Sequence, residues 1–276
     1  MIEVVRPGAS AAKAKVVIFD FDGTISLIRS GWMDVMVPMC LEQLVTLRTG
    51  EPESKLVEAV EEFVWRLTGK ETIYQMMALA EAIRLRGGEP LDPLAYKRMY
   101  LDRLSVRIVD RLEDLRQHRV TPERYLVPGA RELLESLLHR GLRLYLASGT
   151  DDANVKEEAA LLDVARYFDG RVYGAQDDLK SFSKALLVQQ ILSRASFEPE
   201  QLLVFGDGYV EIEEVKKAGG VAVGVATAEP ECLAVDPWKR RRLIQVGADF
   251  IVPNYLDFNG MAAPLFGSAV HAPGVI

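Results

Sequence analysis

The chain has 276 residues, of which 49% are hydrophobic and 26% charged, and its formal net charge is -7. This composition is typical of a globular protein with room for one large domain, or for a core with a sizeable insertion. The acidic balance argues against sequence-independent binding to nucleic acid, because neutralising backbone phosphates requires a basic face. The basic cluster from Lys239 to Arg242 is short, and we interpret it as a solvated helix face rather than a polyanion site.

The cysteines and the first residues of the chain bear on its location. Cys40 and Cys232 are far apart and lie in no metal-binding or redox spacing, which fits a reducing compartment. Residues 1–14 lack the apolar core of a signal peptide, and no window approaches the ~20 apolar residues of a membrane-spanning helix. The sequence therefore predicts a cytoplasmic protein without a membrane partner.

Short apolar runs, typical of strands buried on both faces of a parallel sheet, occur once near the start of the chain and four times in its second half. They are Val16–Phe19, Leu142–Ala147, Leu202–Phe205, Val221–Ala226 and Phe250–Val252. Helical patterns separate the later runs, at Ala130–Arg140, Asn154–Leu162, Lys184–Ala195 and Val210–Ala218. This alternation predicts an α/β fold with a doubly wound, Rossmann-like parallel sheet.

The segment from about Arg29 to Arg119 has helical periodicity throughout and no convincing strand. Four helices fit it, at Trp32–Arg48, Glu53–Thr68, Thr72–Arg86 and Pro93–His118. We therefore expect an all-α domain, residues 29–119, inserted into a core made of residues 1–28 and 120–276. A separate four-helix bundle is the plain alternative. Residues 258–276, rich in Gly, Ala and Pro, are expected to form an irregular end.

Acidic residues directly follow two of the apolar runs, at the place where ligands bind in open α/β sheets. Asp20 and Asp22 are spaced to aim both carboxylates into one cleft, and Gly23 permits a turn that a residue with a Cβ would resist. Asp207 and Glu211 offer oxygen ligands that suit a hard cation. The alternatives are a loop start that favours Asp, and a glycine-rich turn before an acidic helix start.

Two further segments offer groups that could bind an anion. Ser148 and Gly149 can offer a hydroxyl and a backbone N–H to an anion, although Ser148 or Thr150 would serve equally well as a helix N-cap. Lys184 opens a predicted helix, where a cation is unfavourable unless an anion lies in front of it. Lys180 competes with it for this role. Around one pocket, these groups could hold Mg²⁺ and a phosphoryl group, with one aspartate free to attack phosphorus.

These motifs resemble the four signatures of the haloacid dehalogenase-like phosphatase superfamily, in its phosphoglycolate phosphatase and β-phosphoglucomutase branch. The matching residues are DFDGT from Asp20, SGT from Ser148, the lone Lys184, and GDG with a later acid around Asp207. The resemblance implies a Rossmann-like core with a helical cap between the first and second signatures. It also implies that Asp20 is the nucleophile, and that Asp22 is the general acid and then the base.

The resemblance further implies a ligand set. Asp20, Asp22 through its backbone carbonyl, and Asp207 would bind Mg²⁺, while Ser148, Gly149 and Lys184 would hold the phosphoryl oxygens. Glu211 departs from the aspartate usual at its position, which leaves open whether it contacts the metal. Because Asp22 is present, the resemblance favours phosphoryl transfer over dehalogenation.

The cap, by the same resemblance, would select a leaving group through its turn at Gly69, Thr72 and Gln75, although these residues would equally suit a plain helix–helix turn. The sequence around Gly69 is not a P-loop, because Val64 stands where that motif needs glycine. The predicted protein is thus a Mg²⁺-dependent phosphatase of a small phosphorylated metabolite, with no nucleic-acid or membrane partner. A phosphomutase and a non-catalytic binding module are the alternatives.

Overall fold

The computed structural model describes residues 2–176, 183–195 and 197–267. The chain divides into two compact units, one made of Met1–Leu27 and Thr121–Ile276, the other of Ile28–Val120. We call them the α/β unit and the helical unit. The helical unit extends one residue beyond each end of the predicted range 29–119.

The α/β unit is built on a 7-stranded sheet in the order β1-β7-β6-β5-β2-β3-β4. Its strands are β1 (Glu3–Val4), β2 (Val16–Phe19), β3 (Arg143–Asp151), β4 (Val172–Ala175), β5 (Leu202–Gly206), β6 (Val221–Val225) and β7 (Phe250–Val252). β1 pairs antiparallel with β7, whereas the neighbouring pairs from β7 to β4 are parallel. The predicted doubly wound α/β class is therefore confirmed. The sequence analysis missed β1, which has only two residues, and β4, in which only Val172 and Tyr173 are typical strand residues.

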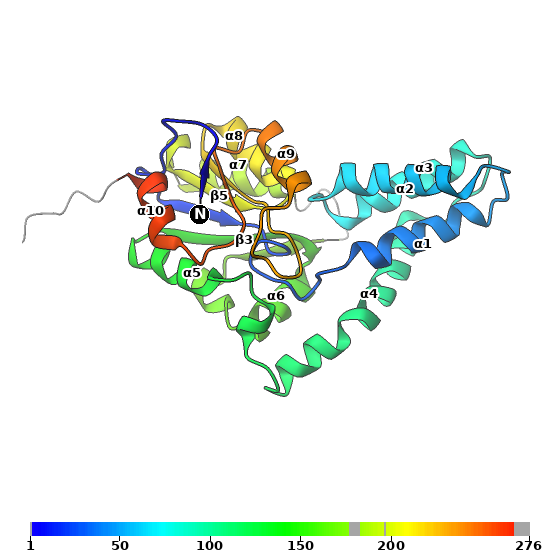
Figure 1. The fold of residues 1–276 in the computed structure, drawn as a ribbon, viewed down its shortest axis with the longest axis horizontal. Helices are drawn as coiled ribbons and strands as arrows, with labels where there is room; N and C mark the ends of the chain where they lie inside the picture. The colour runs from blue at the N-terminus through cyan, green and yellow to red at the C-terminus, as the bar shows by residue number, and fades with distance from the viewer. Residues whose placement is uncertain (1, 177–182, 196, 268–276) are drawn as a thin grey trace, which may run out of the picture. The chain divides into compact units, whose positions relative to one another are not determined.

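Six α-helices belong to the described part of the α/β unit. They are α5 (Ala130–His139), α6 (Asp152–Leu161), α7 (Lys184–Ala195), α8 (Tyr209–Ala218), α9 (Pro237–Gln245) and α10 (Phe258–Phe266), with short 3-10 helices η1 (Pro122–Tyr125), η2 (Ala165–Phe168) and η3 (Pro199–Gln201). Figure 1 shows α7, α8 and α9 on one face of the sheet and α5 on the other. The predicted irregular end is wrong for 258–266, which form α10, and residues 268–276 lie outside the described part.

Side chains that alternate along the central strands fill both faces of the sheet. On the face of α7 and α8, Val16 and Ile18 join a buried cluster with Leu187 and Ile212. On the other face the ring of Phe19 stacks on that of Phe205, with centroids 5.0 Å apart. Because both faces are apolar, the polar groups of this unit are left to the strand ends.

The helical unit contains four α-helices, which lie close to the predicted ranges. They are α1 (Met33–Val45), α2 (Glu53–Leu67), α3 (Thr72–Leu85) and α4 (Pro93–Arg116). The side chain of Asp92 caps α4 by accepting from the backbone N–H of Leu94, and Pro93 begins the helix without needing a donor. Within this unit, Arg111 on α4 donates to the backbone oxygens of Ile28 and Ser30, which fixes the entering chain to its longest helix.

The two chain segments that lead out of the α/β unit are paired with each other inside that unit. The backbone N–H of Leu27 donates to the carbonyl of Tyr125 over 2.8 Å, and that of Val127 donates to the carbonyl of Ile25 over 2.9 Å. Leu27 is thus bonded within the α/β unit and Ile28 within the helical unit, so the boundary between the units falls between these two residues.

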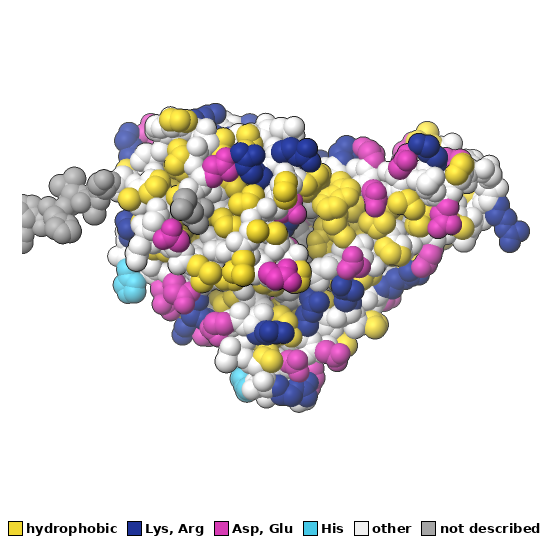
Figure 2. All heavy atoms as spheres, in the orientation of Figure 1, with side chains coloured by type: hydrophobic (Ala, Val, Ile, Leu, Met, Phe, Trp, Pro, Cys, Tyr) yellow, Lys and Arg dark blue, Asp and Glu magenta, His cyan; other side chains and the backbone are white. Residues whose placement is uncertain are grey.

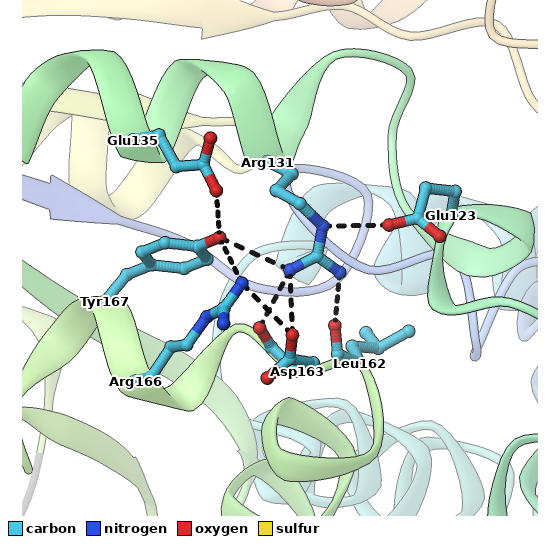
Figure 3. A network of polar contacts seen from close by, with 7 residues as sticks. All are labelled: Glu123, Arg131, Glu135, Leu162, Asp163, Arg166 and Tyr167. Atoms are coloured by element: carbon cyan, nitrogen blue, oxygen red, sulfur yellow. Dashed lines mark hydrogen bonds and ion pairs between the residues drawn. The ribbon is translucent and has the colours of Figure 1, made fainter.

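An arginine network anchors the returning segment (Figure 3). Arg131, on α5, donates from Nε to the carboxylate of Glu123 over 2.8 Å, and from its two Nη atoms to the backbone oxygens of Leu162 and Asp163. The hydroxyl of Tyr167 accepts from Arg166 and donates to Glu135 beside it. A planar guanidinium with several fixed donors suits this role, since it joins η1, α5 and the end of α6 at one point.

Acidic and basic side chains are intermingled on the face drawn in Figure 2. The basic residues of α9 differ from one another in how they are paired and buried. Arg240 pairs with Glu3, whereas the ammonium group of Lys239 is paired with two carboxylates and its side chain is mostly buried. The interpretation of this cluster as a solvated face is therefore wrong for Lys239. Among the helices described, none is both long and apolar enough to cross a membrane.

Candidate active site

Polar residues from several segments meet where β2 and β5 end. These two strands are parallel neighbours. From β2 the chain order of the strands runs through β3 and β4 to one edge of the sheet, and through β5, β6 and β7 toward the other. The backbone N–H of Asp20 donates to the carbonyl of Phe205, and the backbone N–H of Asp207 donates to the hydroxyl of Thr24, over 3.0 Å. These bonds hold the loop after β2 against the tip of β5. The arrangement matches the crevice in which doubly wound sheets bind ligands.

Three carboxylates form a compact acidic cluster at this edge. One oxygen from each of Asp20, Asp207 and Glu211 lies within 4.8 Å of the others. Gly23 makes the close approach possible, because it has a φ of +73° and a Cβ there would lie 2.3 Å from Oδ2 of Asp207. The predicted acids on β2 and β5 are thus brought together, although they are far apart in the sequence.

Lys184 lies inside this cluster. Its Nζ is 2.9 Å from Oδ1 of Asp20 and 2.8 Å from Oε2 of Glu211, and only 4% of its side chain is exposed. Burial alone would favour the neutral amine, but the charges of Asp20 and Glu211 outweigh it and raise the pKa of Lys184 above its usual value. Lys184 is therefore a fixed cation at the start of α7. Lys180 lies outside the described residues.

The carboxyl group of Asp20 is in an unusual environment for an acid. Burial raises its pKa well above the ordinary value, the ammonium of Lys184 opposes that rise, and the nearby charges of Glu211 and Asp207 add to it. Buried like charges at one point are unfavourable without a compensating cation. Two ammonium groups, that of Lys184 and that of Lys239 on Asp207, face these three carboxylates and Glu229, so the acids are in excess.

Asp22 faces a different set of partners. Its Oδ2 accepts from the hydroxyl of Thr150 over 2.7 Å and lies 3.4 Å from the hydroxyl of Ser148. Both hydroxyls come from β3, which continues through these residues to Asp151 with a shift of register. The carboxylate of Asp22 is therefore held away from the acidic cluster by the strand beside it, and it is not part of the three-carboxylate group.

Glu211 uses both of its oxygens within the protein. Oε1 accepts from the backbone N–H of Gly208 over 2.9 Å, which caps α8, and Oε2 accepts from Lys184. Gly206 packs against this side chain, since a Cβ at that position would lie 2.2 Å from Oε1. The geometry makes Glu211 the residue that orients Lys184, while it remains within reach of a cation held by Asp20 and Asp207.

The donor set fits a hard divalent cation. Mg²⁺ prefers oxygen ligands and one or two carboxylates, with the remaining positions filled by water and substrate oxygens. Asp20 and Asp207 supply such carboxylates, and a divalent cation would offset the excess negative charge left by Lys184. The residues present therefore suit Mg²⁺.

The other predicted site residues are placed as follows. Gly149 lies within β3, between Ser148 and Thr150. In the helical unit, Thr72 is the first residue of α3, and the side-chain amide of Gln75 donates to the backbone oxygen of Val64 over 3.3 Å. Gln75 thus joins α3 to the end of α2 within its own unit.

Three residues of the site went unnoticed or were given another role in the sequence analysis. Thr150 was considered only as a helix cap, although its spacing of two from Ser148 in an extended strand signals that both hydroxyls share a face. Thr24 completes the DFDGT motif and binds the backbone of Asp207. Lys239 could not be found from the sequence, because it reaches Asp207 from 32 residues away through the order of the strands.

The chain matches a family model described as haloacid dehalogenase-like hydrolase over residues 14–219. This range covers well over half of the chain and includes the acidic cluster, Lys184 and the hydroxyls of β3. The chain belongs to this family of hydrolases.

Individual relatives are more distant. The chain is 32% identical over 124 residues to a phosphorylated carbohydrates phosphatase of Thermotoga maritima, which is 42% of this chain and 56% of that protein. It is 33% identical over 125 residues to a phosphoglycolate phosphatase of Salmonella paratyphi A, which is 44% of this chain and 48% of that protein. The chain thus spans about half the length of the curated relatives it matches.

Solved structures share the fold over nearly the whole chain. A predicted phosphoglycolate phosphatase from Haemophilus somnus has a TM-score of 0.59 at 16% identity, with 91% of this chain and 98% of that one covered. CbbY from Rhodobacter sphaeroides, in complex with phosphate, has a TM-score of 0.54 at 16% identity, with 89% and 96% covered. At these identities the likeness establishes the fold.

Proposed function

We propose that the protein is a Mg²⁺-dependent phosphatase that hydrolyses a small phosphomonoester, such as a sugar phosphate, through an aspartyl-phosphate on Asp20. Family membership and the phosphatase activity in the names of its relatives support the reaction class. The observation that carries the proposal is the buried pair of Asp20 and Lys184 beside Asp207, at the ends of adjacent parallel strands. Structural stability alone does not explain such a group, because burying charges costs more than most ion pairs return.

The first step would use Asp20 as the nucleophile. A carboxylate oxygen of Asp20 forms a bond to phosphorus while the bond from phosphorus to the leaving oxygen breaks. Asp22 gives its proton to that leaving oxygen, and the hydroxyl of Thr150 keeps the acid in position. Lys184 stabilises the negative charge that develops on the phosphoryl oxygens. Ser148 and the backbone N–H of Gly149 would bind the same oxygens.

The second step would return Asp20 to its starting state. Asp22, now a carboxylate, takes a proton from water, whose oxygen attacks phosphorus and releases inorganic phosphate from Asp20. Mg²⁺, when bound by Asp20, Asp207 and the backbone carbonyl of Asp22, would neutralise phosphoryl charge and allow a carboxylate to approach a phosphate dianion. Glu211 acts in both steps by holding Lys184.

The helical unit would act as a cap that selects the leaving group. Within this proposal, Thr72 is the residue that would contact substrate, because the amide of Gln75 is already bonded to Val64. Closure around the few backbone bonds between the units would exclude bulk water and strengthen the electrostatic interactions of the site.

The test is a phosphate-release assay over a panel of phosphorylated metabolites, including phosphoglycolate and several sugar phosphates, with Mg²⁺ or with a chelator. We expect Mg²⁺-dependent release of inorganic phosphate, abolished in Asp20→Asn. Glucose 6-phosphate appearing from glucose 1-phosphate without phosphate release would assign the phosphomutase alternative instead. If Asp20→Asn kept both the biological role and the partner binding of the natural protein, a non-catalytic module would replace the proposal.

A further inference from the structure

A second buried ion pair contacts the acidic cluster from the side of α9. The Nζ of Lys239 lies 3.0 Å from Oδ2 of Asp207 and 3.1 Å from Oε1 of Glu229. The side chain of Lys239 is only 16% exposed, and those of Asp207 and Glu229 are 14% and 23% exposed. Unlike Lys184, this lysine belongs to none of the four motifs that resemble the family signatures.

The local sequence explains why Lys239 faces the site. Asp236 caps α9 by accepting from the backbone N–H groups of Trp238 and Lys239, and it does so with the same oxygen. α9 packs against β6 and α8, and Arg242 lies one turn further on with its guanidinium over the ring of Tyr209. Both cations therefore lie on the side of α9 that meets the start of α8.

Glu229 lies in a loop that is held by hydrogen bonds to the backbone, and its carboxylate contacts Lys239. Thr227 donates its hydroxyl to the carbonyl of Pro253, and the N–H of Ala228 donates to the carbonyl of Ala234. These bonds fix the residues on both sides of Glu229. The carboxylate of Glu229 thus acts as a second, stationary partner that keeps the ammonium of Lys239 in place.

The ammonium group of Lys239 lies between the carboxylates of Asp207 and Glu229 and is paired with both of them. Of the two carboxylate oxygens of Asp207, Lys239 donates to Oδ2, and a Cβ at Gly23 would lie 2.3 Å from that same oxygen.

We propose that Lys239 is a positioning residue that leaves Asp207 only one oxygen for a metal ion, and that it thereby favours Mg²⁺ over Ca²⁺. The inference rests on the metal site of the proposed function. A bidentate carboxylate would bring the divalent ion against Oδ2, where the ammonium would repel it. Ca²⁺ gains from bidentate carboxylates because it takes six to eight ligands, whereas Mg²⁺ needs six near-octahedral ligands and loses nothing when Asp207 binds through one oxygen.

The test measures metal binding directly by isothermal titration calorimetry, with MgCl₂ and CaCl₂ at constant ionic strength. Lys239→Met removes the ammonium and keeps the length of the side chain. Lys216→Met is the matched control, because Lys216 has a similarly buried side chain, 17% exposed, and pairs with Asp249 away from the site. We expect the ratio of the two dissociation constants to shift toward Ca²⁺ by roughly tenfold in Lys239→Met, within the range known for residues that orient metal ligands. Lys216→Met should leave the ratio unchanged.

Glu229→Gln provides the second variant, since it keeps the ammonium but removes its outer anchor. Lys239 should then move with Asp207, and we expect a smaller shift of the same sign. If Lys239→Met tightened Mg²⁺ and Ca²⁺ equally, its effect would be one of charge alone and the proposal would be overturned. The same holds if the ratio did not change.

Failure of this inference can be told apart from failure of the proposed function. If the unaltered protein binds Mg²⁺ and releases phosphate while Lys239→Met keeps the metal preference, only the role of Lys239 is lost. If the unaltered protein binds neither ion, both the metal site and the role of Lys239 are rejected. Asp207→Asn identifies the site, because it should weaken both ions.

Discussion

Two sets of charged residues, one taken from each unit of the molecule, show two different uses of charge. In the helical unit, ion pairs such as Arg103 with Glu42 and Arg107 with Asp34 join helices across exposed surfaces, with side chains 37–69% exposed. In the α/β unit, Lys184 and Asp20 are nearly inaccessible, with 4% and 7% of their side chains exposed. The exposed pairs are screened by water, whereas the buried ones have been removed from it at a cost.

The difference separates structural from chemical use of charge. Exposed pairs between helices contribute little and can be lost one at a time. The buried residues depend on each other, because removing one leaves an uncompensated charge in a place that water reaches poorly. Substitutions of the buried residues around Lys184 should therefore affect both activity and stability, and substitutions of the exposed Arg103–Glu42 and Arg107–Asp34 pairs should affect neither strongly.

The largest effect on rate short of removing the nucleophile is expected at Asp22. Asp22→Asn cannot donate or accept a proton, and we expect the turnover rate to fall by roughly 10²–10⁴-fold. Thr150→Val removes only the hydroxyl that orients Asp22 and should lose less. Steady-state kinetics on the best substrate of the panel give both values. Equal losses in the two variants would mean that Asp22 acts through its position and not through its proton.

Lys184 should come next. Lys184→Ala removes a fixed cation from a buried site, and we expect a loss of roughly 10²–10³-fold in kcat/KM, comparable to the removal of one preorganised electrostatic contact. Lys180→Ala is the paired variant, since it removes the competing lysine of the same motif. An inactive Lys180→Ala protein with an active Lys184→Ala protein would reverse the assignment.

The contrast between units can also be measured as stability. Arg131→Met breaks the network of Figure 3, in which the arginine side chain is 15% exposed, and should lower the free energy of unfolding by about 2 kcal/mol. Arg103→Met breaks an exposed pair of the helical unit and should cost about 0.5 kcal/mol or less. Urea unfolding followed by circular dichroism measures both. Similar losses in the two variants would contradict the expectation that a buried charged residue contributes more to stability than an exposed one.

An effect confined to alkaline pH is expected from the buried thiol of the helical unit. Burial raises the pKa of Cys40 to about 12, from an ordinary value of 9.0. The unfolded chain therefore loses this proton first as pH rises, so the contribution of Cys40 is complete below pH 9.0 and is lost as pH rises toward about 12. The free energy of unfolding should fall in that window by up to about 1.4 kcal/mol per pH unit for this group.

Cys40→Ala should reduce that alkaline slope, measured as the pH dependence of the urea midpoint. The comparison is between slopes, so the constant cost of losing the sulfur does not enter. Cys232 gives an internal scale, because its pKa is raised only to about 11 and its window is narrower. An unchanged slope in Cys40→Ala would show that its thiol is reached by water in the native state.

How far the sequence predicts this molecule depends on how local each signal is. The apolar runs at Val16–Phe19 and Phe250–Val252 and the helix from Lys184 are found as predicted, because they are continuous and carry their own boundaries. α9 was expected only as a basic helix face at Lys239 to Arg242 and without bounds, although Asp236 and Pro237 are a local helix start. β1 and β4 were missed because they contain few typical strand residues, whereas the similarly short β2 and β7 are apolar throughout.

The site divides along the same line. The motifs after two predicted strands indicated Asp20 and Asp207, because a parallel sheet gathers the carboxyl ends of its strands at one edge. A predicted helix start indicated Lys184. The partners that the structure adds, such as Lys239 on Asp207 and Thr150 on Asp22, depend on which strands become neighbours and on how a helix is rotated. Neither the neighbours of a strand nor the rotation of a helix can be predicted from the residue spacing within one segment.

The most direct measurement is acid-quenched labelling with a phosphate ester carrying radioactive phosphorus, followed by peptide mapping. If Asp20 is the nucleophile, the label will be found on the peptide that contains Asp20, will appear only with Mg²⁺, and will be absent from Asp20→Asn. Equal labelling of Asp20→Asn, or a label on another peptide, would contradict the assignment of Asp20.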